Sequence, residues 1–140
     1  MEKERLQEYA ARVTQANRSE LVVIIYEATL ASIEEGKKYL KQGEIEAARH
    51  EIERARSMIT ELMASLDLQY EISHYLRQLY VFAYRELCQG IANRDPEQLN
   101  HATDIFEALL PSFKEVAKQD DSEAVMKNVQ TLSLIHISEP

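Results

Sequence analysis

The chain is poor in the residues that interrupt helices and in those that cross-link chains. Its 140 residues include three glycines, three prolines, one cysteine and no tryptophan. So few glycines and prolines disfavour a fold built from many tight turns and favour a helical one. The single cysteine, Cys88, excludes an internal disulfide, and its place in a helical pattern predicts a small buried side chain.

Long apolar runs and an excess of positive charge are also lacking. No stretch approaches the roughly 18 apolar residues that a membrane span needs, and the first ten residues lack the apolar core of a signal peptide. We therefore expect no membrane span and a cytoplasmic location. The net charge of −8 argues against a nucleic-acid partner, which would require a basic face.

Apolar residues recur at alternating steps of three and four, which predicts an all-α protein. The expected fold is one domain, an antiparallel up-down-up-down four-helix bundle over residues 17–118, because the predicted connections are short. A short N-terminal helix or arm covers residues 1–16, and a polar tail covers residues 119–131. The last nine residues, 132–140, match the translated end of a sequencing adapter, so we expect them to be a scar that replaces the natural C-terminus beyond Thr131.

Three local signals place the ends of these helices. Asn17 and Glu20 form a capping box that starts the first helix, and Gly43 has the position of a C-terminal glycine. Asp95 followed by Pro96 predicts the start of the fourth helix, as a cap and a first-turn proline. Pro111 falls inside the fourth pattern and predicts a kink or break in that helix.

Two segments hold more large apolar side chains than one core face needs. Six apolar residues follow one another over 21–26, and four of the seven tyrosines lie between residues 61 and 87. Periodicity alone leaves ordinary packing and a partner-binding groove about equally favoured, and the unbroken run favours the groove. The residues expected to contact a partner come from these segments and from the arm: Tyr9, Val13, Val22, Tyr26, Met63, Tyr75, Tyr80 and Tyr84.

Catalytic and metal-binding patterns are weak. A di-iron bundle needs two Glu-x-x-His motifs, and Glu71 with His74 supplies a single one. The sequence has no glycine-rich phosphate loop and no cysteine and histidine spacing that fits zinc. We therefore expect no enzyme activity, no cofactor and no metal.

Several short blocks occur in an order that is typical of one known family. The first blocks are Tyr9, then Val13-Thr14-Gln15-Ala16-Asn17-Arg18-Ser19-Glu20-Leu21, and then Ile25-Tyr26. The later blocks are Ala55 with Met58-Ile59, Leu62 and Ser65-Leu66-Asp67, then Leu76 with Leu79-Tyr80, Phe82, Arg85 and Leu87, and finally Asn93-Arg94-Asp95. From Tyr9 to Val116 the chain resembles the flagellar export chaperone family, FliS. It departs from the family pattern at Arg18, where proline is usual, at Ala28, where glycine is usual, and near Phe113, where tryptophan is usual.

The resemblance implies a cytoplasmic chaperone that binds the disordered C-terminal segment of flagellin. Such a chaperone prevents premature polymerisation and delivers flagellin to the flagellar export gate. In the family the N-terminal arm covers part of the binding surface when flagellin is absent, and Tyr9 and Val13 are the candidates for this contact. Two alternatives remain open, a structural homo-oligomer that uses the same surface and a divergent paralogue that binds another helical partner.

Overall fold

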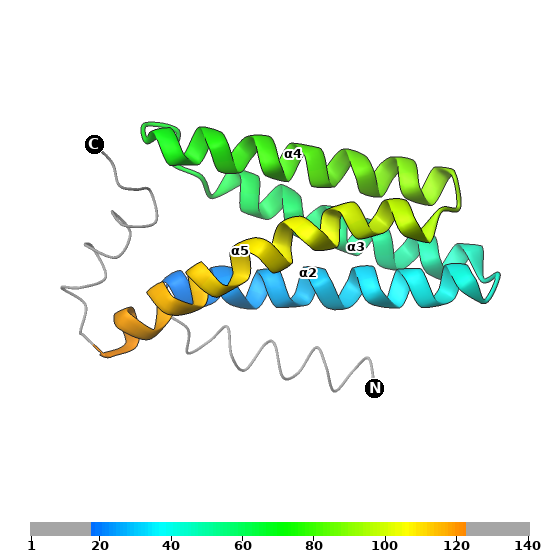
Figure 1. Ribbon diagram of the computed structural model, residues 1–140, viewed down its shortest axis with the longest axis horizontal. Helices are drawn as coiled ribbons and strands as arrows, with labels where there is room; N and C mark the ends of the chain where they lie inside the picture. The colour runs from blue at the N-terminus through cyan, green and yellow to red at the C-terminus, as the bar shows by residue number, and fades with distance from the viewer. Residues whose placement is uncertain (1–17, 123–140) are drawn as a thin grey trace.

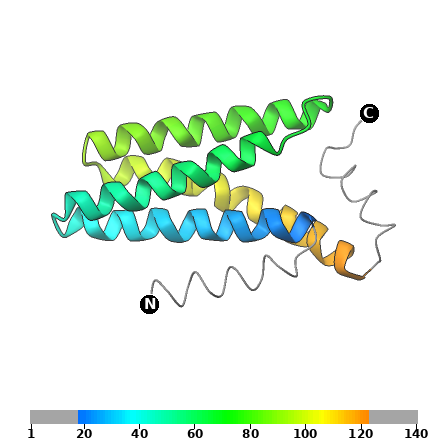
Figure 2. The same cartoon turned by 180° about the vertical axis from the view of Figure 1, so that it is seen from behind.

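A computed structural model describes residues 18–122, and this part of the chain consists of four helices. In chain order they are α2 (Arg18–Lys41), α3 (Ile45–Ala64), α4 (Glu71–Ala92) and α5 (Pro96–Ser122). Both α2 and α4 pack against α3 and α5, so the helices form a closed ring in which sequence neighbours are antiparallel. Figure 1 shows α5 on one side of the bundle, and Figure 2 shows α3 between α2 and α4 on the other. The predicted all-α, up-down-up-down four-helix bundle is confirmed.

Two of the predicted helix-end signals act as expected. Gly43 has a φ of 80°, and its N–H donates to the Leu40 carbonyl at 3.1 Å while the Glu44 N–H donates to the Tyr39 carbonyl at 2.9 Å. This pair of bonds satisfies the last carbonyls of α2 and turns the chain toward α3. At the start of α5 the Asp95 carboxylate accepts from the Glu97 N–H at 3.0 Å, as an N-cap does. The predicted cap Asn17 lies outside the described residues.

The fourth helix is longer and more continuous than the sequence predicts. Pro111 lies inside α5 and does not end it, so a break near Leu109 is the wrong expectation. Proline removes one backbone donor and frees the carbonyl four residues earlier, that of Glu107. Both residues are exposed, which allows water to satisfy that carbonyl. The helix continues past residue 118, the predicted end of the bundle, to Ser122.

Aromatic side chains from three helices fill the centre of the bundle. Tyr26 of α2 is completely buried and Tyr80 of α4 is 2% exposed. Their hydroxyl oxygens lie 2.6 Å apart, so each tyrosine satisfies the other in the core. The Tyr26 ring meets Phe106 and Phe113 of α5 edge-on at centroid distances of 5.2 Å. This cluster joins the first, third and fourth helices of the bundle.

Interior glycines allow two helix pairs to approach closely. A Cβ at Gly36 of α2 would lie 2.7 Å from Cδ1 of Ile52 on α3. A Cβ at Gly90 of α4 would lie 2.7 Å from Cδ2 of Leu99 on α5 and 3.2 Å from the Leu99 backbone nitrogen. The propensity cost of an interior glycine, about 1 kcal/mol, is therefore offset by tighter packing.

The buried tyrosine pair leads to a prediction about stability. Tyr26→Phe or Tyr80→Phe leaves the remaining hydroxyl buried without its partner, and each change should lower the free energy of unfolding by about 1–2 kcal/mol. The double variant should lose less than the sum of the two single variants, because it leaves no orphaned hydroxyl. Urea unfolding at neutral pH measures both effects. Tyr39→Phe is the control, since no hydrogen bond of the Tyr39 hydroxyl is found within residues 18–122, and strict additivity would contradict the prediction.

The same pair predicts a loss of stability at alkaline pH. Burial is the main reason that the pKa of Tyr80 rises to about 12 and that the pKa of Tyr26 rises well above its usual value of 10. The native state therefore holds these protons more tightly than the unfolded state does. Their contribution is complete below pH 10. The contribution of Tyr80 is lost as the pH rises through 12, and that of Tyr26 also falls over this range. Unfolding midpoints between pH 8 and pH 12 should fall more steeply for the natural chain than for the Tyr26→Phe/Tyr80→Phe variant, and equal slopes would refute this.

Candidate partner-binding surface

Three large hydrophobic side chains are exposed within residues 18–122. They are Leu68, Tyr75 and Phe82, with 47%, 55% and 44% of their surface accessible. Leu68 lies in the turn between α3 and α4. Tyr75 and Phe82 are seven residues apart on α4 and therefore lie on one side of that helix, with the partly buried Leu79 between them. This side of α4 presents a continuous apolar stripe.

The stripe on α4 is turned toward α5. Glu86 follows Phe82 by four residues on the same side of α4, and its carboxylate contacts His101 of α5. On α5, the side that carries His101 continues with Ile105 and Leu109, which pack partly buried against the core. We call the surface formed by Tyr75, Leu79, Phe82, Ile105 and Leu109 the α4–α5 face.

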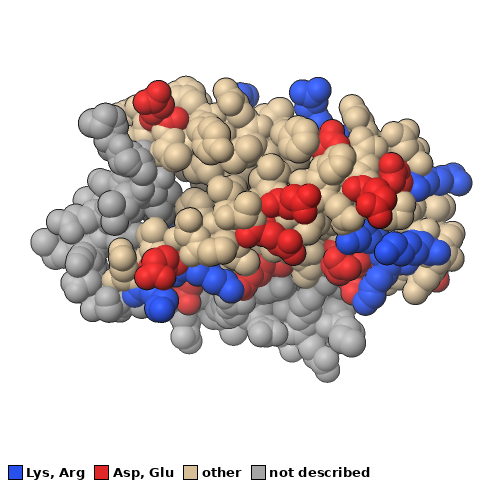
Figure 3. Space-filling view, in the orientation of Figure 1, with Lys and Arg blue, Asp and Glu red and all other residues tan. Residues whose placement is uncertain are grey.

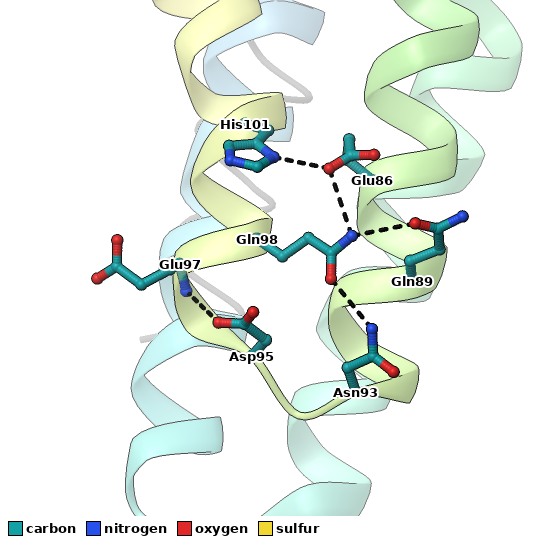
Figure 4. A network of polar contacts seen from close by, with 7 residues as sticks. All are labelled: Glu86, Gln89, Asn93, Asp95, Glu97, Gln98 and His101. Atoms are coloured by element: carbon teal, nitrogen blue, oxygen red, sulfur yellow. Dashed lines mark hydrogen bonds and ion pairs between the residues drawn. The ribbon is translucent and has the colours of Figure 1, made fainter.

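One end of the α4–α5 face is closed by a polar network, which Figure 4 shows. The Glu86 carboxylate accepts from His101 Nδ1 at 2.7 Å and from Gln98 Nε2 at 3.4 Å. Gln98 Nε2 also donates to Gln89 Oε1 at 3.1 Å, and Asn93 Nδ2 donates to Gln98 Oε1 at 3.2 Å. We call these five residues the polar clasp, because they tie α4 to α5 beside the Asp95 turn.

Within residues 18–122, the other end of the α4–α5 face is open. Figures 1 and 2 show α4 and α5 drawing apart with distance from the turn at Asp95, until the late part of α5 lies far from the start of α4. In the space-filling view of Figure 3 the open part of this face is largely uncharged, and charged side chains gather toward the turn and the lower edge. The face thus changes from polar at its closed end to apolar at its open end.

Charges in the polar clasp stabilise one another. The hydrogen bond from His101 is the main reason that the pKa of the Glu86 carboxyl is lowered. The same bond is the main reason that the pKa of the His101 imidazole is raised. A raised histidine pKa favours the imidazolium, which is the form that pairs best with the carboxylate. Both side chains reach solvent, so the pair joins the helices without a buried charge.

Two of the expected partner-contact residues lie in the core instead. Tyr26 and Tyr80 are buried and hydrogen-bonded to each other, so the expectation that they lie on a partner-binding surface is corrected. The spacing admits two inward stripes, one through Ile72 and Leu79 and another through Leu76 and Tyr80. The structure selects the second, and it leaves Ile72 and Leu79 partly buried at the α5 side.

The other expected contact residues do not form one surface. Tyr75 belongs to the α4–α5 face, whereas Tyr84 lies under the Arg56 guanidinium on the α3 side of α4. Met63 of α3 and Val22 of α2 are partly buried and pack against the core. Tyr9 and Val13 lie outside the described residues. Phe82 was missing from the expected set, although its spacing of seven from Tyr75 was a usable signal.

Comparison with known protein families finds one match. A family model described as "Flagellar protein FliS" matches residues 1–120. The chain belongs to the FliS family of flagellar export chaperones. Comparison with individual curated proteins finds no match.

Part of the FliS pattern is explained by packing in the bundle. Tyr26 and Tyr80 belong to separate blocks of that pattern, 54 positions apart, and their hydroxyls meet in the core. Ser65 lies in another block, and its hydroxyl donates to the Leu62 carbonyl at 2.8 Å at the end of α3. These residues of the FliS pattern therefore support the bundle, and exposed residues such as Tyr75 and Phe82 are better candidates for partner contact.

In the part of the chain that the structure describes, none of the helices is both long and apolar enough to cross a membrane. No group of three histidine, cysteine, aspartate or glutamate side chains within residues 18–122 is arranged to hold a metal ion. The His74 imidazole of the single Glu-x-x-His motif contacts the Leu68 carbonyl at 2.7 Å, across the turn that precedes α4.

The polar clasp predicts an elevated histidine pKa. His101 should titrate above its usual value of 6.5 in an NMR pH titration, and Glu86→Gln should lower that midpoint because the charged acceptor is removed. The contribution of His101 to stability is complete below pH 6.5 and is lost as the pH rises through the native pKa. Glu97→Gln on α5 is the control, since Glu97 makes its contact to Asp95 through the backbone. A midpoint that Glu86→Gln leaves unchanged would contradict the assignment.

Proposed function

We propose that this FliS-family chain binds the disordered C-terminal segment of flagellin along the α4–α5 face. In this proposal the chain works in the cytoplasm, prevents premature polymerisation of flagellin and delivers it to the flagellar export gate. The observation that carries the proposal is the exposed pair Tyr75 and Phe82, which face a partly buried apolar flank of α5. Binding and release, without catalysis, are sufficient for this role.

The α4–α5 face suits an amphipathic helix. Tyr75 and Phe82 are separated by seven residues, or about 10 Å along α4 at 1.5 Å per residue. A helix with apolar residues at steps of three and four would place two successive turns against them. Ile105 and Leu109 would contact the same helix from the other side. Leu68, in the turn before α4, extends the exposed apolar surface toward the end of the bundle.

Disorder of the free ligand is compatible with tight binding only if a large area is buried. A segment that folds on binding loses conformational entropy, and burial of apolar surface must offset that loss. Contact along the whole α4–α5 face would supply part of this area. The same contact would cover the apolar side of the flagellin segment, which would then be unable to pair with other flagellin subunits.

Substitution of the two exposed aromatics tests the proposal. Tyr75→Ser/Phe82→Ser should weaken binding of a flagellin C-terminal peptide by at least about tenfold, because two aromatic contacts are lost. The unfolding free energy should change little, since both side chains are exposed in the free protein. Isothermal titration calorimetry at several temperatures measures the affinity and should give a large negative heat-capacity change for the natural chain.

Matched variants separate this role from general effects on the fold. Gln42→Ser changes an exposed glutamine in the turn between α2 and α3, outside the α4–α5 face, and should leave the affinity unchanged. No detectable peptide binding at tens of micromolar would refute the proposal. If light scattering instead shows a concentration-dependent oligomer that Tyr75→Ser/Phe82→Ser dissociates, a second copy of the chain covers this face and the homo-oligomer hypothesis replaces the chaperone one.

A further inference from the structure

The side of α4 away from the α4–α5 face packs beside an arginine of α3. There α4 packs against α3, and this pair makes the least extensive contact of the four neighbouring pairs in the bundle. The Arg56 guanidinium of α3 lies over the Tyr84 ring with its carbon 5.6 Å from the ring centroid. Arg56 Nη1 also lies 3.5 Å from Cys88 Sγ. Arg56 therefore faces α4, while Tyr84 and Cys88 face α3.

Helical spacing extends this contact into two facing stripes. Residues at steps of three and four share a side of a helix, so the stripes follow from the positions of Arg56, Tyr84 and Cys88. We call the combined surface the α3–α4 flank, and it consists of Arg49, Glu53, Arg56, Thr60 and Met63 on α3 and of Arg77, Val81, Tyr84 and Cys88 on α4. It holds three arginines and one glutamate, although the whole chain carries a net charge of −8.

Arg56 and Arg77 lack carboxylate partners within the described residues. Neither makes an ion pair at 4.0 Å or less there, whereas Arg49 pairs with Glu46. Arg56 Nε is buried without a hydrogen-bond partner, and the thiol of Cys88 is a weak acceptor for Nη1. A partly buried guanidinium without a carboxylate has lost hydration that the Tyr84 ring and the Cys88 thiol replace only in part. Such a cation would gain from an incoming carboxylate, which accepts strong charge-assisted hydrogen bonds.

We propose that the α3–α4 flank is a second docking surface, one that binds an acidic helical segment of a partner protein. Arg77 precedes Tyr84, the ring that carries Arg56, by seven residues, or about 10 Å along α4. Two carboxylates seven residues apart on the incoming helix would match this separation. Between them, apolar side chains of the partner would contact Val81 and Met63, which are partly buried.

Charge distinguishes this surface from the α4–α5 face. The acidic groups Glu86, in the clasp on α4, and Asp104, on α5, both raise the pKa of His101. On the α3–α4 flank Arg56 and Arg77 have no carboxylate partner within residues 18–122, and Glu53 is the single acidic residue. An acidic segment is therefore favoured on the α3–α4 flank and disfavoured near the polar clasp.

A synthetic peptide pair tests the proposal on the full chain. The probe is a capped, alanine-rich helical peptide with two glutamates seven residues apart and leucines between them, and its counterpart has glutamine in place of both glutamates. The glutamate peptide should bind at least about tenfold more tightly in fluorescence anisotropy, and the difference should shrink as salt is raised. Arg56→Gln and Arg77→Gln should each remove most of this preference. Lys118→Gln on α5 removes the same unit of charge from an exposed position outside the flank and should leave the preference intact.

Backbone NMR shifts and the flagellin peptide distinguish this proposal from the first one. On addition of the glutamate peptide, the largest changes in backbone amide shift should occur at Thr60 and Val81. Thermal melts should show that Arg77→Gln leaves the unfolding midpoint of the protein unchanged. Arg77→Gln should not lower the affinity for the flagellin C-terminal peptide, whose proposed contacts are Tyr75 and Phe82. Equal affinities for the two synthetic peptides, or shifts centred on Tyr75 and Phe82, would overturn the second docking surface and leave the proposed function untouched.

Discussion

The rotation of α4 about its own axis decides which of its side chains lie toward α5 and which lie toward α3. The buried Tyr26–Tyr80 contact fixes that rotation. With Tyr80 directed at Tyr26 across a hydroxyl separation of 2.6 Å, its ring stacks on Phe106 and cannot turn outward without leaving a buried hydroxyl unsatisfied. Tyr75 and Phe82 are then carried to the α5 side and Tyr84 to the α3 side. The core contact therefore sets the surfaces that are available for binding.

The connection between α4 and α5 divides their shared surface into two parts. The polar clasp holds the helices together near the Asp95 turn, where Glu86, Gln98 and His101 satisfy one another. Away from the turn the helices separate (Figure 1), and Tyr75 and Phe82 of α4 are exposed there within residues 18–122. A binding surface in this position costs little stability, because the core stripe through Leu76, Tyr80 and Leu87 is complete without it.

Some residues of the FliS family pattern have structural roles in the bundle. Several residues of the family pattern act inside the bundle or at its turns, as Tyr26, Tyr80 and Ser65 do. In this chain, therefore, part of the family pattern fixes the rotation of α4 and the end of α3. Exposed residues on the same scaffold are the ones available to contact a partner. For this chain they give two proposed surfaces of different chemistry on α4.

The amino-acid sequence by itself determined the four helices, some of their ends and the bundle. Gly43 and Asp95 act locally, within a few residues, and short connections leave antiparallel packing as the outcome. It did not determine which stripe of α4 faces inward, because steps of three and four admit both Leu79 and Tyr80, and only packing against Tyr26 and Phe106 selects Tyr80. Nor did it show that Pro111 would remain inside α5, which depends on an exposed carbonyl. The candidate surface depends on which stripe of α4 faces inward. Tyr75, Tyr80 and Tyr84 are the same residue type on one helix, and only the packing of the helices decides which of them is exposed, which is buried and which contacts α3.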